Sequence, residues 1–85
     1  MMPIQEVRAL LEKAFPGDTI RLISPMGDNH HFQCELISSR FEGKGMVEQH
    51  QMVYRALGDA MAEAVHALAL RTYTPEQWRK QEGRV

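Results

Sequence analysis

Hydrophobic and polar residues alternate with two different periods along the chain, and the first of these is helical. Near the N-terminus, apolar side chains recur at steps of three and four residues, at Ile4, Val7, Leu11 and Ala14. Pro3 suits the first turn of a helix, and the Pro16-Gly17 pair does not continue one. The pattern therefore predicts an amphipathic helix that ends before residue 16.

The next two apolar stretches have the period of a strand. Thr19 to Ser24 alternates between polar and apolar side chains, and so does the run at Phe32, Cys34 and Leu36. The segment from Pro25 to Asn29 between them is rich in turn-forming residues. We expect two antiparallel strands joined by this turn.

A longer helix and a third strand follow. From Met46 to Val65, apolar residues share one helical face, at Val53, Leu57, Met61 and Ala64. Gly58 lies inside this predicted helix at a cost of about 1 kcal/mol relative to alanine, and we expect its missing side chain to permit close packing against the sheet. His66 to Tyr73 alternates again and predicts the third strand.

A short C-terminal helix is predicted after that strand. Thr74 offers a capping hydroxyl, Pro75 suits the first helical position, and Gln77 completes a capping box. This helix carries Trp78, which we expect to pack against the sheet. We expect the residues after Lys80 to be frayed.

The order of these elements predicts the topology. A helix that connects two strands of one sheet leaves those strands parallel. We therefore predict an α+β fold of the order αββαβα, with a three-stranded mixed sheet covered by helices, in which strands 1 and 2 are antiparallel and strands 2 and 3 parallel. The 85 residues are expected to form a single domain over 1–85, with an ordered core at about 3–80.

Composition narrows the functional classes. The chain has a formal net charge of −1 and one cysteine, Cys34. No secretory leader and no apolar stretch of bilayer length is found, so we expect a cytoplasmic protein that does not enter membranes. The charge disfavours binding that depends on neutralising phosphates. An enzyme is the least favoured class, because no nucleophile–base pairing or phosphate-binding glycine loop is recognisable.

Histidines gather at one predicted edge of the sheet. If strands 2 and 3 are parallel neighbours, His30 and His31 at the start of one lie beside His66 at the start of the other. Imidazole suits iron, zinc and copper, and two histidines replace two thiolates on one iron of Rieske clusters. Two histidines alone cannot hold a cluster, so the hypothesis is a site shared with another molecule. The competing interpretation is that these side chains only pack or form hydrogen bonds.

Several segments resemble the BolA family. They are Ser39-Arg40-Phe41-Glu42-Gly43, Gln49 to Tyr54, Val65 to Leu68 and Thr72 to Trp78, within a similarity that extends from Ile4 to Trp78. The short loop from Met26 to His30 resembles the short-loop, histidine-type branch of the family. The resemblance implies a class II KH-like fold.

The resemblance also implies a function. In BolA-like proteins the C-terminal histidine, here His66, ligates a [2Fe–2S] cluster shared with a monothiol glutaredoxin and glutathione, and the partner supplies the thiolates. The second ligand comes from the loop between the first two strands, here His30 or His31, and strand phase slightly favours His30. Such a protein helps to transfer or sense the cluster in iron–sulfur cluster assembly and iron homeostasis. Alone, it would hold no cluster and be a monomer or weak homodimer.

The alternative function is a DNA-binding transcriptional regulator with a KH-like or helix-turn-helix-like surface. Its candidate nucleic-acid contacts are the basic residues Arg40, Lys44 and Arg55. The Gly43-Lys44-Gly45 spacing differs from the G-x-x-G loop of KH domains. Gln49 and Gln51 flank His50 where BolA relatives often carry arginine, which weakens this hypothesis. An interaction module without a metal is a third alternative.

Overall fold

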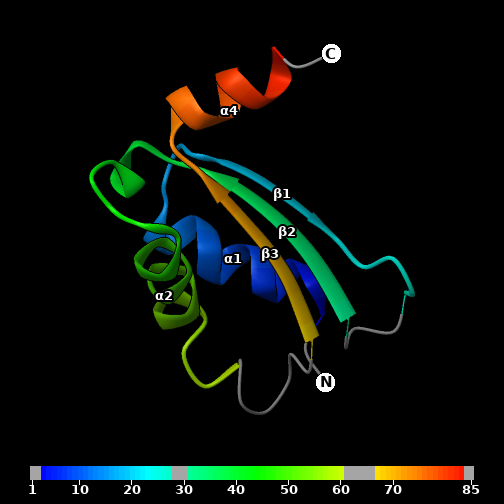
Figure 1. The fold of residues 1–85 in the computed structure, drawn as a ribbon. Coiled ribbons are helices and arrows are strands. Elements are labelled where there is room, and N and C mark those ends of the chain that lie inside the picture. The colour runs from blue at the N-terminus through cyan, green and yellow to red at the C-terminus, as the bar shows by residue number, and fades with distance from the viewer. Residues whose placement is uncertain (1–2, 28–30, 61–66, 84–85) are drawn as a thin grey trace.

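The computed structural model describes residues 3–27, 31–60 and 67–83, which form a mixed sheet packed against helices (Figure 1). In chain order the elements are α1 (Ile4–Ala14), β1 (Thr19–Ile23), β2 (His31–Ile37), the 3-10 turn η1 (Ser39–Phe41), α2 (Met46–Leu57), β3 (Ala67–Tyr73) and α4 (Pro75–Glu82). The strands are ordered β1-β2-β3, with β1 antiparallel and β3 parallel to β2. This arrangement confirms the predicted α+β fold class and topology.

The alternation of side chains gives the sheet two different faces. Helices α1 and α2 cover one face of the sheet (Figure 1). Leu22, Phe32 and Leu36 are buried in the core between this face and the helices. Cys34 of β2 belongs to the same core. The rest of the core comes from the helices and from the connections between elements, namely Val7, Leu11, Phe15, Phe41, Val53, Leu57 and Ala60. Arg21 and Gln33 alternate with these positions and are exposed on the opposite face. The hydrophobic effect therefore fixes which face of each strand meets the helices.

The long helix ends earlier than its hydrophobic pattern predicts. Helix α2 stops at Leu57, and Gly58 caps it with φ +55° and ψ −131°, a backbone conformation that side chains with a Cβ rarely adopt. A Cβ built on Gly58 would meet only the Arg55 carbonyl oxygen, at 3.9 Å. The predictions of a continuous helix to Val65 and of close packing between Gly58 and the sheet are therefore wrong. Gly58 is required for its backbone freedom, and residues 61–65 lie outside the described part of the chain.

The C-terminal helix has the predicted capping box. The Gln77 backbone N–H donates to Thr74 Oγ1 at 3.1 Å, and the Thr74 N–H donates to Gln77 Oε1 at 2.8 Å. Trp78 packs edge-on against Tyr73 with ring centroids 5.2 Å apart. Helix α4 continues to Glu82. None of the helices in the described ranges is long and apolar enough to cross a membrane.

Candidate metal-binding edge of the sheet

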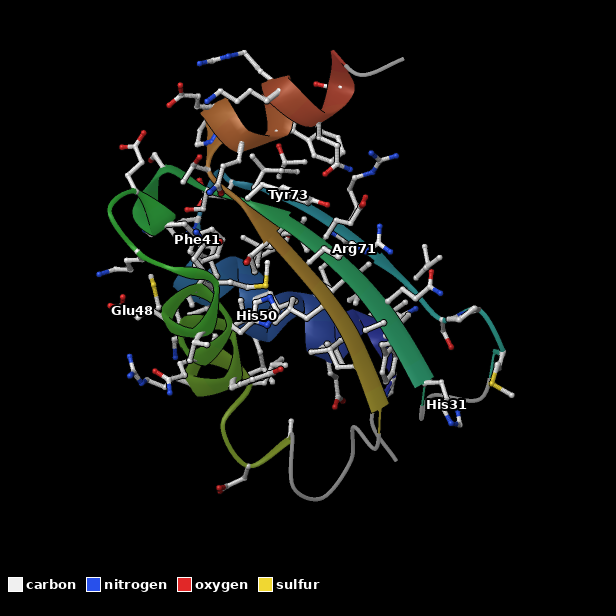
Figure 2. All side chains as sticks on the ribbon, viewed as in Figure 1. His31, Phe41, Glu48, His50, Arg71 and Tyr73 are labelled. Atoms are coloured by element: carbon white, nitrogen blue, oxygen red, sulfur yellow. The ribbon has the colours of Figure 1, made fainter. Side chains whose placement is uncertain are left out.

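The two parallel strands begin side by side, at the edge where a metal site was predicted. The register pairs His31, the first residue of β2, with Ala67, the first residue of β3. Figure 2 shows His31 at this end of the sheet. His30 and His66 lie outside the described residues. His31 is thus the one predicted ligand that the structure places.

His31 lies on the face of the sheet that the helices leave open. It has the strand phase of Gln33, which is exposed, whereas Phe32 and Cys34 point into the core. A hollow of about 450 Å³ adjoins it, lined by Pro25, His31, Phe32, Gln33, Leu68 and Ala69. Two large apolar side chains near this end are exposed, Ile23 by 53% and Met26 by 68%. This end of the sheet therefore presents an imidazole together with apolar surface.

Cys34 is a core residue in the middle of β2. Its side chain is 1% exposed. Burial raises the pKa of the Cys34 thiol from 9.0 to about 11, although the nearby Arg8 charge opposes the shift. The thiol is therefore neutral at physiological pH and is a poor metal ligand. Among the residues that the structure describes, no three or more His, Cys, Asp or Glu side chains form a group that could hold a metal ion.

His50 belongs to a different part of the molecule. It lies on α2 (Figure 2). Its ring packs edge-on against Tyr54 with centroids 6.3 Å apart. The side chain is half-buried. His50 therefore packs within α2, away from the edge where β2 and β3 begin.

Gln49 has a structural role that the sequence interpretation missed. It is 3% exposed and joins three segments. Its Nε2 donates to the Lys44 carbonyl oxygen at 2.9 Å, and its Oε1 accepts from Thr72 Oγ1 at 2.7 Å. A side chain at position 49 therefore faces the interior, so an arginine there could not reach a phosphate without moving out of the core. The sequence does contain a sign that Gln49 is buried: it comes four residues before the buried Val53 and so lies on the same face of the helix.

The three basic candidates for DNA contact are not equivalent. Arg40 Nη1 lies 2.8 Å from Asp18 Oδ2, and the same oxygen accepts from Ser38 Oγ at 2.6 Å. Ser38 is 1% exposed and its Oγ also accepts from the Arg40 backbone N–H at 3.0 Å. Arg40 thus links η1 to the start of β1 through Asp18. Lys44 and Arg55 are exposed.

The structure is that of a small α+β domain. Its three-stranded mixed sheet carries an exposed histidine, His31, where the two parallel strands begin. Residues 6–77 match the family model described as BolA-like protein. BolA-like protein 1 of Mus musculus is 38% identical over 81 residues, which cover 87% of this chain and 59% of that protein. The DNA-binding transcriptional regulator BolA of Escherichia coli (strain K12) is 35% identical over 77 residues, which cover 87% of this chain and 73% of that protein.

The structural comparison gives the same result. The solution structure of BolA1 from Mus musculus is similar with a TM-score of 0.78 and 36% sequence identity, covering 96% of this chain and 73% of that one. The chain described here belongs to the BolA family. Its matched part corresponds to about three fifths of the mammalian BolA-like protein 1, 59% in the mouse protein.

Proposed function

We propose that this BolA-family protein ligates a [2Fe–2S] cluster through His66 and one histidine at the start of β2, His30 or His31. The cluster would be shared with a monothiol glutaredoxin and glutathione, and the protein would help to transfer or sense it in iron–sulfur cluster assembly and iron homeostasis. The observation that carries the proposal is the parallel register, which pairs His31 with Ala67. His66 directly precedes Ala67 in the sequence, so the two candidate ligand segments belong to adjacent strand starts.

The register also favours one choice of second ligand. His30 precedes His31 by one position, as His66 precedes Ala67. Extended by one residue, the observed pairing would match His30 with His66. Neighbouring strands are about 4.8 Å apart, a separation that allows two imidazoles to reach one iron. We therefore propose His30 as the second ligand, with His31 as the alternative.

The chemistry of the available donors fits a shared site. A [2Fe–2S] cluster requires four protein or thiol ligands and, when bound, supplies one-electron chemistry whose potential depends on the ligand set. The chain has one cysteine, and that thiol is buried with its pKa raised to about 11. The thiolates would then come from the glutaredoxin and glutathione, and the exposed apolar side chains of Ile23 and Met26 offer surface that a docked protein would cover.

The test is visible circular dichroism during titration into a glutaredoxin that carries the cluster with glutathione. The unmodified protein should change the spectrum, because imidazole replaces part of the thiolate ligation. His66→Ala should abolish the change, and one of His30→Ala and His31→Ala should do the same. His50→Ala is the matched control, because that ring packs on α2, and it should behave as the unmodified protein. An unchanged response in His66→Ala would contradict the ligand assignment.

A DNA-binding transcriptional regulator is the second candidate. The specific observation in its favour is the name of the E. coli relative, which is 35% identical to this chain. Lys44 and Arg55 are exposed and would contact phosphates from the connection before α2 and from its last turn. The affinity for duplex DNA should then fall steeply with salt concentration. Fluorescence anisotropy at several salt concentrations tests this, and a salt-independent affinity would contradict it.

A further inference from the structure

The face of the sheet opposite α1 and α2 has a concave surface that, apart from Ile23, the proposed function does not use. In the described part of the chain, only α4 contacts this face, at the end where Tyr73 meets Trp78 (Figures 1 and 2). The remainder forms a concavity of about 360 Å³ that reaches Cys34 and is otherwise lined by Arg21, Ile23, Gln33, Glu35, Ala69 and Arg71. Ala69 is small, whereas Gln33 opposite it and Arg71 beside it have longer side chains, which leaves this part of the surface hollow.

Three charged side chains form one row across the concavity. The strand register places Arg21 opposite Glu35 on one side and Arg71 opposite Glu35 on the other. The row therefore carries two positive charges and one negative charge. Arg21 Nη1 lies 3.7 Å from Glu35 Oε1, so the single carboxylate is engaged by Arg21.

Arg71 provides the charge that this row leaves uncompensated. Its side chain is exposed on the open face (Figure 2). No carboxylate in residues 3–27, 31–60 or 67–83 lies within ion-pair distance of it. Arg21 is further held by Trp78, whose ring centre is 5.8 Å from the guanidinium carbon. The concavity thus combines a fixed arginine, an available arginine and the exposed amide of Gln33.

We propose that this concavity binds an acidic peptide segment of a partner protein. A carboxylate of the peptide would pair with Arg71, and an adjacent apolar side chain would lie on Ile23, which is 53% exposed, and on Ala69. A guanidinium fork suits a carboxylate because it can donate two parallel hydrogen bonds. This binding does not depend on the metal ligands proposed above.

The charge pattern favours a peptide over a nucleic acid. A phosphodiester chain gains affinity by having several phosphates neutralised, which requires a broad excess of basic residues. This row has a net charge of only +1, and Glu35 would repel a second phosphate. One carboxylate with apolar neighbours matches both the single available charge and the apolar part of the lining.

The test is an NMR titration of the ¹⁵N-labelled full chain with a synthetic peptide. The probe is acetylated and amidated Leu-Leu-Glu-Leu-Leu, and its counterpart with glutamine in place of glutamate measures the contribution of charge. We expect the acidic peptide to shift the amide signals of Gln33, Ala69 and Arg71. Arg71→Gln should weaken binding about fivefold, the upper range for an exposed ion pair. Glu35→Gln should strengthen it, because the charge of Arg21 is then no longer paired with a carboxylate.

The matched control is Arg55→Gln, which makes the same change of charge on α2, an element that packs on the covered face (Figure 1). Its affinity for the acidic peptide should equal that of the unmodified protein. The proposal is overturned if Arg71→Gln and Arg55→Gln bind equally, or if the peptide shifts signals only outside the concavity. It is equally overturned if single-stranded oligothymidine binds this face more tightly than the peptide does.

Discussion

Cys34 illustrates how the environment of one side chain decides its chemistry. The residue lies in β2 with its side chain 1% exposed, and burial raises the pKa of the thiol from 9.0 to about 11. Folding therefore stabilises the protonated thiol relative to the thiolate. The contribution to stability is complete below pH 9, where the thiol is neutral in both states. It is lost as the pH rises through 11, because the unfolded chain ionises first.

This argument gives a prediction for alkaline solution. The free energy of unfolding of the unmodified protein should fall by about 2–3 kcal/mol more than that of Cys34→Ala between pH 8 and pH 11. Urea denaturation of both proteins at a series of pH values measures the difference, and tyrosine and lysine ionisation cancels between them. Parallel stability curves would show that the thiol ionises as easily in the folded protein as in the unfolded one.

A second residue prediction concerns the two glycines that cap helices. Gly58 ends α2 with φ +55°, whereas Gly83 ends α4 with φ −72°. We expect Gly58→Ala to lower the free energy of unfolding by about 2 kcal/mol, because a Cβ is strained in that conformation. Gly83→Ala is the control and should change it by less than about 0.5 kcal/mol. Chemical denaturation of both variants tests this, and equal losses would mean that the conformation of Gly58 costs nothing.

Gly58 and Gln49 also show what single residues conceal in the sequence. The apolar spacing at Val53 and Leu57 continues beyond Gly58, so periodicity alone predicts one unbroken helix. The positive φ of Gly58 does not change the spacing of apolar residues, so that spacing cannot reveal it. Gln49 lies on the same helical face as the core residue Val53, but a polar side chain is usually exposed. Its burial is explained only by the hydrogen bonds that it forms with Thr72 and with the Lys44 carbonyl oxygen.

At the scale of elements, the capping box before α4 could be predicted from the sequence, because all its hydrogen-bonding groups lie within the four residues from Thr74 to Gln77. The hydroxyl of Thr74 and the amide of Gln77 satisfy each other's backbone N–H groups. We expect Thr74→Ala to lower the free energy of unfolding by about 1 kcal/mol. Thr74→Ser keeps the hydroxyl and should retain most of that stability. Urea denaturation followed by fluorescence of Trp78, the single tryptophan, provides the measurement.

An equal loss in both variants would indicate that the methyl group of Thr74, and not its hydroxyl, stabilises the start of α4. The strands and α1 were also predicted closely, because each has a regular alternation or helical spacing, whereas α2 ends at Leu57 and not at Val65. The strands begin and end within two residues of the predicted limits where the structure describes them, and α1 agrees with its prediction. Tertiary contacts such as that between Asp18 and Arg40 have no comparable local pattern.

At the scale of the molecule, the crossover rule predicted the edge that brings the two strand starts together. It could do so because a helix between two strands restricts them to a parallel arrangement. The register that pairs His31 with Ala67 is a finer property, set by which side chains fill the core. The open face of the sheet was not anticipated as a surface with chemistry of its own, because Arg21, Glu35 and Arg71 are far apart in the sequence.

A contact between residues far apart in the sequence also distinguishes Arg40 from the other basic residues considered for DNA binding. Arg40 is held by Asp18, whose side chain is only 15% exposed, so its charge stabilises the junction between α1, β1 and η1. We expect Arg40→Gln to lower the free energy of unfolding by about 1 kcal/mol and to leave the affinity for DNA unchanged. Lys44→Gln should have the opposite profile, with unchanged stability, weaker DNA binding and a salt dependence reduced by about one phosphate contact. Urea denaturation and anisotropy titrations of both variants measure these effects. Loss of DNA affinity in Arg40→Gln without loss of stability would show that Asp18 releases the arginine when DNA binds.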